Sequence, residues 1–171
     1  NDGKPVLDIT APSASVNRTD ERDPYVFTYN GKTLMYVAEG DHIGVYRSTD
    51  GIRWTKADAA AEAKIQPATF FRGRTWSDNA PIECPVLKTM KTPTGDKQVL
   101  FFGAKDASRG ETTGTYYTVG HLDANGMFVA DTDTQRLDHG PDYYGANFTG
   151  RTDISTAEDT ITSLGWVGNW N

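Results

Sequence analysis

The sequence is poor in cysteine, in basic residues and in long apolar runs. Its 171 residues include one cysteine, and 17 basic residues against 23 acidic ones give a net charge of −6. A single cysteine permits no internal disulfide and cannot build a structural zinc site. The acidic excess argues against a nucleic-acid partner, because phosphates favour a basic surface. No run approaches the roughly 20 apolar residues of a membrane span, so we expect no membrane partner either.

The three histidines are scattered without the spacing of metal ligands, and the sequence has no glycine-rich phosphate loop. We therefore expect neither a metal nor a cofactor.

Extended structure dominates what the sequence does contain. Short runs rich in Val, Ile, Thr, Tyr and Phe are bounded by turn residues, a pattern typical of antiparallel strands. The predicted strands are Pro24–Tyr29, Thr33–Ala38, Ile43–Arg47, Pro85–Thr89, Gln98–Ala104, Thr115–His121 and Thr160–Val167. Only Lys56–Lys64 has a helical character, which we interpret as a loop with one helical turn. The chain is therefore predicted to be all-β.

The strand pattern also repeats along the chain. Asp23 begins one cycle that ends near Asp50–Trp54, and Glu83 begins a second in which Asp123–Phe128 takes the matching place. Tyr143–Phe148 resembles the start of a third. About four strands per cycle and a period of roughly sixty residues are typical of β-propeller blades. We predict about two and a half blades of four-stranded antiparallel sheet, too few to close a ring; a β-sandwich of meandering strands is the alternative.

Two acidic residues stand at the mouths of apolar strands, each with a proline close by. They are Asp23, followed by Pro24, and Glu83, followed by Cys84 and Pro85. Cleavage of a glycosidic bond requires two such carboxyl groups in different roles. Taken alone, each also fits a plain structural role, as a turn cap or an exposed edge residue. In this order and spacing they favour a glycosidase.

The flanking residues predict a different role for each carboxyl. Arg22 beside Asp23 favours an ionised carboxylate, which suits sugar hydroxyls and an oxocarbenium-like transition state. Glu83 has apolar neighbours in sequence, and Lys88 is the nearest basic residue. Desolvation raises the pKa of a carboxyl, as a general acid working near neutral pH needs. Cys84 is interpreted as a small buried neighbour, because no histidine is expected close enough to activate it.

A third segment combines acids and aromatic residues around a Gly-Pro turn. Asp138, Asp142 and Tyr144 could form a platform for a sugar, or could equally form a turn between blades. Near the end of the chain, Trp166 is predicted to lie in the core, and Trp170 is a candidate site residue.

These motifs resemble glycoside hydrolase family 32, the levanases, inulinases and invertases. The resemblance rests on Arg22-Asp23-Pro24, Glu83-Cys84-Pro85, Leu137–Tyr144 and Gly165–Trp170, and covers nearly the whole chain. It implies part of a five-bladed β-propeller catalytic domain with retaining chemistry on levan, inulin or sucrose. It further implies Asp23 as transition-state stabiliser, Glu83 as general acid/base, and a substrate-binding set of Arg22, Cys84, Asp138, Asp142, Tyr144 and Trp170.

One part of the family pattern is missing. The family's nucleophile is an aspartate in a Trp-Met-Asn-Asp-Pro-Asn-Gly motif on the first blade, and Asn1–Pro5 shares only the Asn-Asp pair. That pair also lies far closer to Asp23 than the family motif does. We therefore name no nucleophile, and we expect residues 1–171 to be a partial catalytic domain that lacks the first blade and the ring-closing segment. This chain alone should be inactive.

Three other functions stay open at this point. A fructosyltransferase would form the same covalent intermediate and differ only in whether a sugar hydroxyl or water resolves it. A related propeller family acts on arabinose or xylose, and a propeller without the nucleophile could simply bind carbohydrate. An enzyme acting on fructan is expected to be secreted or at the cell surface, and one acting on sucrose to be cytoplasmic.

Overall fold

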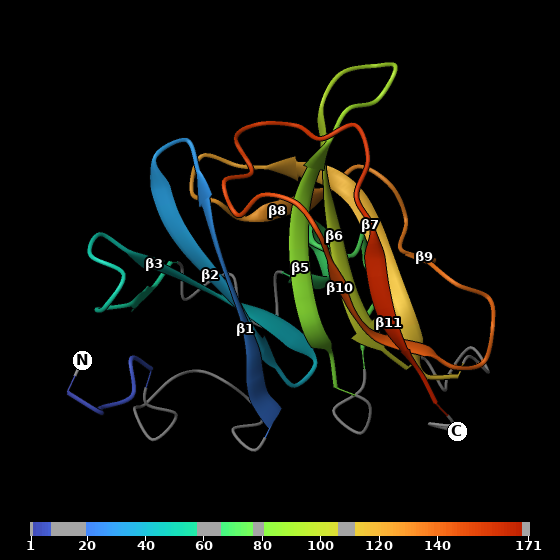
Figure 1. Ribbon diagram of the computed structural model, residues 1–171, viewed down its shortest axis with the longest axis horizontal. Coiled ribbons are helices and arrows are strands. Elements are labelled where there is room, and N and C mark those ends of the chain that lie inside the picture. Colours follow the sequence, from blue (N-terminus) through green and yellow to red (C-terminus); the bar gives the residue numbers. More distant parts are fainter. Residues whose placement is uncertain (1, 8–19, 58–65, 77–80, 106–111, 169–171) are drawn as a thin grey trace.

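The computed structural model describes residues 2–7, 20–57, 66–76, 81–105 and 112–168. These ranges contain eleven strands and one short helix (Figure 1). The elements are β1 (Glu21–Tyr29), β2 (Lys32–Glu39), β3 (His42–Ser48), β4 (Thr55–Lys56), α1 (Gln66–Thr69), β5 (Glu83–Met90), β6 (Lys97–Ala104), β7 (Gly114–Leu122), β8 (Phe128–Ala130), β9 (Gln135–Arg136), β10 (Tyr143–Phe148) and β11 (Ser163–Val167). No helix within the described ranges is long and apolar enough to cross a membrane.

The strands form three antiparallel sheets that follow one another along the chain. The first has the order β1-β2-β3-β4, the second β5-β6-β7-β8 with β9 also paired to β7, and the third consists of β10 and β11. Asn30 and Gly31 join β1 to β2 with φ angles of 49° and 74°, the left-handed pair that a tight hairpin requires. The first strands of the three sheets, β1, β5 and β10, lie next to one another (Figure 1).

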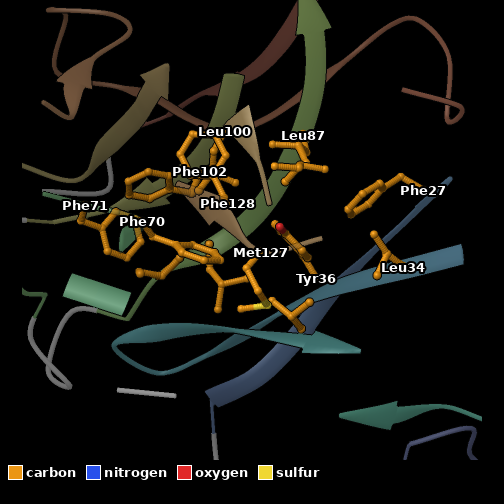
Figure 2. Close-up of a cluster of buried hydrophobic side chains, with 14 of the residues drawn as sticks. Phe27, Leu34, Tyr36, Phe70, Phe71, Leu87, Leu100, Phe102, Met127 and Phe128 are labelled. Carbon is orange, nitrogen blue, oxygen red and sulfur yellow. The ribbon is translucent and has the colours of Figure 1, made fainter. Parts of the chain in front are cut away.

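The main hydrophobic core lies between the first and second sheets (Figure 2). Alternate residues of each strand point into it, because side chains on a strand alternate between the two faces. The first sheet contributes Leu34, Tyr36, Ile43 and Val45, and the second contributes Leu87, Leu100, Phe102, Tyr116 and Phe128. Burial of each such aliphatic or phenyl side chain stabilises the fold by about 1.5–3 kcal/mol.

A short segment, made of α1 and the following Phe70 and Phe71, covers one side of this core. Gln66, in α1, accepts a hydrogen bond from the backbone nitrogen of Ile43 at 2.8 Å and donates one to the backbone oxygen of the same residue. The two following aromatic residues insert between the sheets: Phe70 packs edge-on against Phe128 at 5.8 Å between ring centroids, and Phe71 against Phe102 at 5.3 Å. The amide of Gln66 thus attaches this segment to β3, while Phe70 and Phe71 fill the core.

The connection between β10 and β11 fastens all three sheets together. Thr28 of β1 donates its backbone N–H to Thr152 at 2.8 Å and accepts one from Ile154 at 2.9 Å. Thr89 of β5 donates its hydroxyl to Ile154 at 2.6 Å and accepts a backbone hydrogen bond from Glu158 at 2.9 Å. The side chain of Ile154 is 2% exposed and belongs to the main core. This connection therefore holds the far ends of β1 and β5 in place.

The opposite face of the first sheet carries a buried polar cluster. Glu39 is completely buried, and its carboxylate accepts hydrogen bonds from His42 at 3.1 Å, from Lys56 at 3.0 Å and from the hydroxyl of Tyr46. A Cβ at Gly44 would lie 2.1 Å from Oε1 of Glu39, so only glycine leaves room for this carboxylate. The cluster is satisfied internally, as a buried charge requires.

The partners in this cluster shift both of its central pKa values. Burial opposes ionisation of Glu39, but the bonds from His42 and Tyr46 and the charge of Lys56 outweigh it and lower the pKa of Glu39. Burial likewise opposes protonation of His42, but Glu39 on one ring nitrogen and Asp41 on the other, at 3.0 Å, raise its pKa. A ring with a carboxylate at each nitrogen favours the imidazolium, since only that form has two N–H donors.

Most of the predicted strands are confirmed. The last of them begins at Ser163 rather than at residue 160. Of the segment expected to contain a helical turn, Lys56 lies in β4 and residues 58–64 lie outside the described part of the chain, while α1 follows at Gln66. The placement of Trp166 in the core was wrong: it lies on β11 and is 62% exposed.

Replacing Ile154 should test the fastening of the sheets. Ile154→Ala removes a buried side chain and should lower the free energy of unfolding by about 2–5 kcal/mol, measured by denaturant titration. The matched control is Ile52→Ala, because Ile52 is 54% exposed and its loss should change stability by less than about 0.5 kcal/mol. Equal effects at the two sites would show that the connection adds nothing to stability.

The buried cluster should make stability depend on pH in a defined direction. The raised pKa of His42 gives a contribution that is complete below its ordinary value of 6.5 and is lost as pH rises through the folded value. The lowered pKa of Glu39 gives one that is present above 4.5 and is lost as pH falls. His42→Gln should therefore cost most between these values, about 3–5 kcal/mol, and progressively less at higher pH.

Unfolding titrations of the wild type and this variant across the pH range measure the difference. His121→Gln is the control, because His121 pairs with Asp131 at the surface. A stability difference for His42→Gln that grows above pH 6.5 would contradict the assignment.

Candidate active site

The first strands of the three sheets contain the same irregularity. In β1 the register shifts between Arg22 and Tyr25, so that two residues oppose one on β2. The same shift occurs in β5 after Glu83 and in β10 after Tyr144. The residues just before the three shifts are Arg22, Glu83 and Tyr144, and each is 61 positions after the previous one. A bulge of this kind bends the strand and redirects the neighbouring side chains.

Each bulge begins with a residue in the left-handed region of backbone conformation. The φ angles are 57° at Asp23, 49° at Cys84 and 57° at Gly145. Glycine adopts this conformation without strain, whereas it is uncommon for other residues. Strained backbone that the surrounding structure holds in place is often found at functional sites. The two strained positions are here the aspartate and the cysteine singled out in the sequence.

The residues just before these three left-handed positions are Arg22, Glu83 and Tyr144, and Glu83 contacts the other two. Arg22 donates a hydrogen bond from Nε to Oε1 of Glu83 at 3.0 Å, and its Nη2 forms an ion pair with the same oxygen at 3.0 Å. Tyr144 donates its hydroxyl to Oε2 of the same carboxyl group. Arg22 also pairs through Nη1 with Asp20 at 2.8 Å. The side chains of Arg22 and Glu83 are 36% and 26% exposed, so the group is open to solvent on one side.

The strained positions themselves are joined in a second contact. Oδ2 of Asp23 accepts a hydrogen bond from the backbone nitrogen of Cys84 at 3.0 Å, and the thiol of Cys84 lies 3.6 Å from the same oxygen. The two bulges are thereby linked directly. Asp23 and Glu83, distant in sequence, consequently lie at the starts of two adjacent strands, β1 and β5.

The surroundings shift the pKa values of three groups. The hydrogen bond to Asp20, opposed by burial and assisted by Glu83, raises the pKa of Arg22. Burial, together with the charge of Asp23, raises the pKa of Cys84 to about 12, so its thiol stays protonated and is a poor nucleophile. Burial and the bond to Glu83 also raise the pKa of Tyr144, which keeps its phenolic proton.

Two expectations about charge pairing were wrong. Arg22 was expected to keep Asp23 ionised, but its guanidinium reaches Asp20 and Glu83 instead. Glu83 was expected to lack a basic neighbour, yet it forms a hydrogen bond and an ion pair with Arg22. The bulge at Asp23 redirects the side chains beside it, so adjacency in sequence does not make Arg22 and Asp23 partners.

The remaining predicted site residues lie elsewhere or outside the described ranges. Asp138 is exposed on the connection from β9 to β10, where its carboxylate accepts the backbone N–H of Gly140 at 2.9 Å. It also lines a hollow of about 460 Å³ beside Phe101. Asp142 is half-buried immediately before β10. Trp170 lies outside the described residues.

Sequence reasoning missed two residues next to this site. Asp20 forms an ion pair with Arg22, and the sequence indicates this only by an acidic residue two positions before an arginine. Gly103 pairs in register with Glu83, and a glycine inside an apolar strand does signal a close approach by another group. Across the described chain, no three His, Cys, Asp or Glu side chains are grouped as a metal site requires.

The chain is similar in sequence to several named carbohydrate-active proteins. It is 28% identical over 155 residues to a levanbiose-producing levanase of Geobacillus stearothermophilus, covering 89% of this chain and 36% of that protein. It is 28% identical to a levanase of Bacillus subtilis, covering 90% and 22%, and 26% identical to invertase 2 of Saccharomyces cerevisiae, covering 93% and 29%. The chain thus spans little more than a third of these curated relatives, or less.

The fold is also found in a solved structure, that of a fructofuranosidase from Schwanniomyces occidentalis complexed with fructosylnystose. The two superpose with a TM-score of 0.68 at 22% identity, over 99% of this chain and 29% of the other. The successive sheets are therefore blades of a β-propeller, which confirms the predicted fold class. The family model described as "Glycosyl hydrolases family 32 N-terminal domain" matches residues 1–171, and the chain accordingly belongs to glycosyl hydrolase family 32.

Proposed function

We propose that the protein carrying this chain hydrolyses β-fructosides by a retaining mechanism, with Glu83 as general acid/base and Asp23 as transition-state stabiliser. The observation that supports the proposal is the contact between the two bulges, in which Asp23 binds the backbone N–H of Cys84, the residue after Glu83, and Arg22 binds Glu83. Family membership supports the reaction class. Two carboxyls with unlike surroundings are the arrangement that glycoside cleavage uses.

In the first step, Glu83 gives its proton to the glycosidic oxygen while the bond from that oxygen to the fructosyl carbon breaks. A carboxylate nucleophile, which we assign to no residue of this chain, takes the fructosyl carbon. Water then resolves the covalent intermediate, and Glu83 accepts the proton of that water as a general base. The carboxyl returns to its protonated form, so each cycle consumes one water.

Asp23 acts on the charge that develops in this step. Cys84 holds one of its carboxylate oxygens, and we assign the other to hydroxyl groups of the fructose ring. Charge-assisted hydrogen bonds of this kind strengthen as the ring becomes oxocarbenium-like. The strained backbone at Asp23 fixes the direction of the carboxylate before substrate arrives.

The substrates we propose are fructans or sucrose, since the relatives are named levanase and invertase. A fructan polymer does not cross a membrane, so we propose a secreted or cell-surface location if the substrate is a polymer. If the substrate is sucrose, we propose a cytoplasmic one.

Variants of Glu83 and Asp23 should differ in how strongly their activity depends on the leaving group of the substrate. In the full-length protein, Glu83→Gln should reduce kcat/KM on sucrose by roughly 10²–10⁴. The loss should be much smaller on an aryl fructoside whose phenolate leaves without a proton. Asp23→Asn should slow both substrates alike, because it removes charge stabilisation and no proton. Steady-state kinetics on the two substrates measure the difference.

Asp159→Asn is the control, because this carboxylate is 78% exposed and pairs only with Lys91 in the contacts described. Its kinetics should match the wild type on both substrates. The assigned roles are wrong if the Glu83 and Asp23 variants respond identically to leaving-group quality.

A further inference from the structure

The two oxygens of the Glu83 carboxyl group have chemically different partners. Oε1 accepts a hydrogen bond from Nε of Arg22 and lies 3.0 Å from Nη2 of the same guanidinium, and Oε2 receives the hydroxyl of Tyr144. A guanidinium can only donate, whereas a phenolic hydroxyl can donate or accept. A proton on Oε1 would therefore face the guanidinium, which offers no acceptor, while a proton on Oε2 has an acceptor in Tyr144. The protonated form of Glu83 fits its surroundings only with the proton on Oε2.

The position of Tyr144 depends on a row of residues across the second sheet. Glu83, Gly103 and Thr115 are register partners on β5, β6 and β7. The hydroxyl of Thr115 donates to the backbone oxygen of Tyr143 at 3.2 Å, which fixes the start of β10 over this row. From there the ring of Tyr144 reaches Glu83 at the other end of the row.

Gly103 leaves the space that the tyrosine ring occupies. A Cβ at Gly103 would lie 2.8 Å from Cε2 of Tyr144 and 3.0 Å from both Cζ and the hydroxyl oxygen. A side chain at position 103 would thus collide with the hydroxyl end of the ring. Any larger residue at this position would displace the hydroxyl from Glu83.

We propose that Tyr144, seated across Gly103, is a positioning residue that fixes the transferable proton of Glu83 on Oε2. This inference rests on the proposed function of Glu83. Before the reaction, the Oε2 proton is directed to the oxygen of Tyr144. When the glycosidic oxygen takes this proton and its bond to the fructosyl carbon breaks, Tyr144 turns its own O–H to the new carboxylate. Tyr144 begins and ends the step protonated, in agreement with its raised pKa.

Kinetics of Tyr144→Phe test the role in catalysis. The substitution keeps the ring over Gly103 and removes only the hydroxyl. On sucrose, kcat/KM should fall about tenfold, the effect of losing one hydrogen bond to a charged group. On an aryl fructoside that leaves without a proton, the change should stay within about threefold.

Two further variants separate this role from a general loss of structure. Gly103→Ala keeps the hydroxyl but should displace it, and should reproduce the kinetic pattern of Tyr144→Phe. Tyr143→Phe is the matched control, since the neighbouring tyrosine bonds Ser163 rather than Glu83. Its losses on the two substrates should not differ.

A spectroscopic titration tests the contact without any activity. The difference in phenolate absorbance between the wild type and Tyr144→Phe isolates Tyr144. In a Glu83→Gln background the same difference should titrate at lower pH, because the carboxylate no longer opposes the phenolate. An unchanged titration would overturn the contact and with it the proposal.

Different results would contradict the role of Tyr144 and the proposed function. An active wild type in which Tyr144→Phe loses the same factor on both substrates contradicts the role of Tyr144 alone. A wild type inactive on every fructoside, yet with a phenol titration that depends on Glu83, contradicts the proposed function. Tyr144 is then only a structural partner of Glu83.

Discussion

The bulge repeated in β1, β5 and β10 is the constraint on which the site depends. It occurs at the same place in each first strand, and it brings Arg22, Glu83 and Tyr144 into one connected group. Left-handed backbone at a residue other than glycine costs of order 1–3 kcal/mol. At Asp23 and Cys84 this cost is offset by the hydrogen bond between them and by the paired strands on either side.

The group belongs to no single blade. Each of the three sheets supplies one member, and the side chains meet because β5 lies between β1 and β10 and contacts both. One backbone geometry therefore presents a cation, a carboxyl and a phenol at equivalent positions. The chemistry differs between blades while the fold does not, which is how a repeated architecture can hold an asymmetric site.

Much of the fold could be predicted from the sequence because the strands alternate and their turns carry specific residues. Asn30-Gly31 marks a hairpin, and the recurrence of Asp23 and Glu83 at strand starts indicates the blade period. The partner of Arg22 could not be predicted, since it is set by blade packing across 61 positions. Trp166 was misplaced for a related reason: an aromatic strand residue looks buried in sequence, but β11 exposes it at the edge of a two-stranded sheet.

The connection between β10 and β11 also governs the order of events during synthesis. Its contact from Ser155 to Asn30 spans 125 positions, and such long-range closures form late because the intervening chain must be ordered first. As the chain leaves the ribosome, the first two blades can collapse on their shared core before Ile154 has emerged. Tyr144 and the connection between β10 and β11 emerge after these two sheets. The Glu83 carboxyl consequently acquires its hydrogen bond from Tyr144 only after the two preceding sheets have folded.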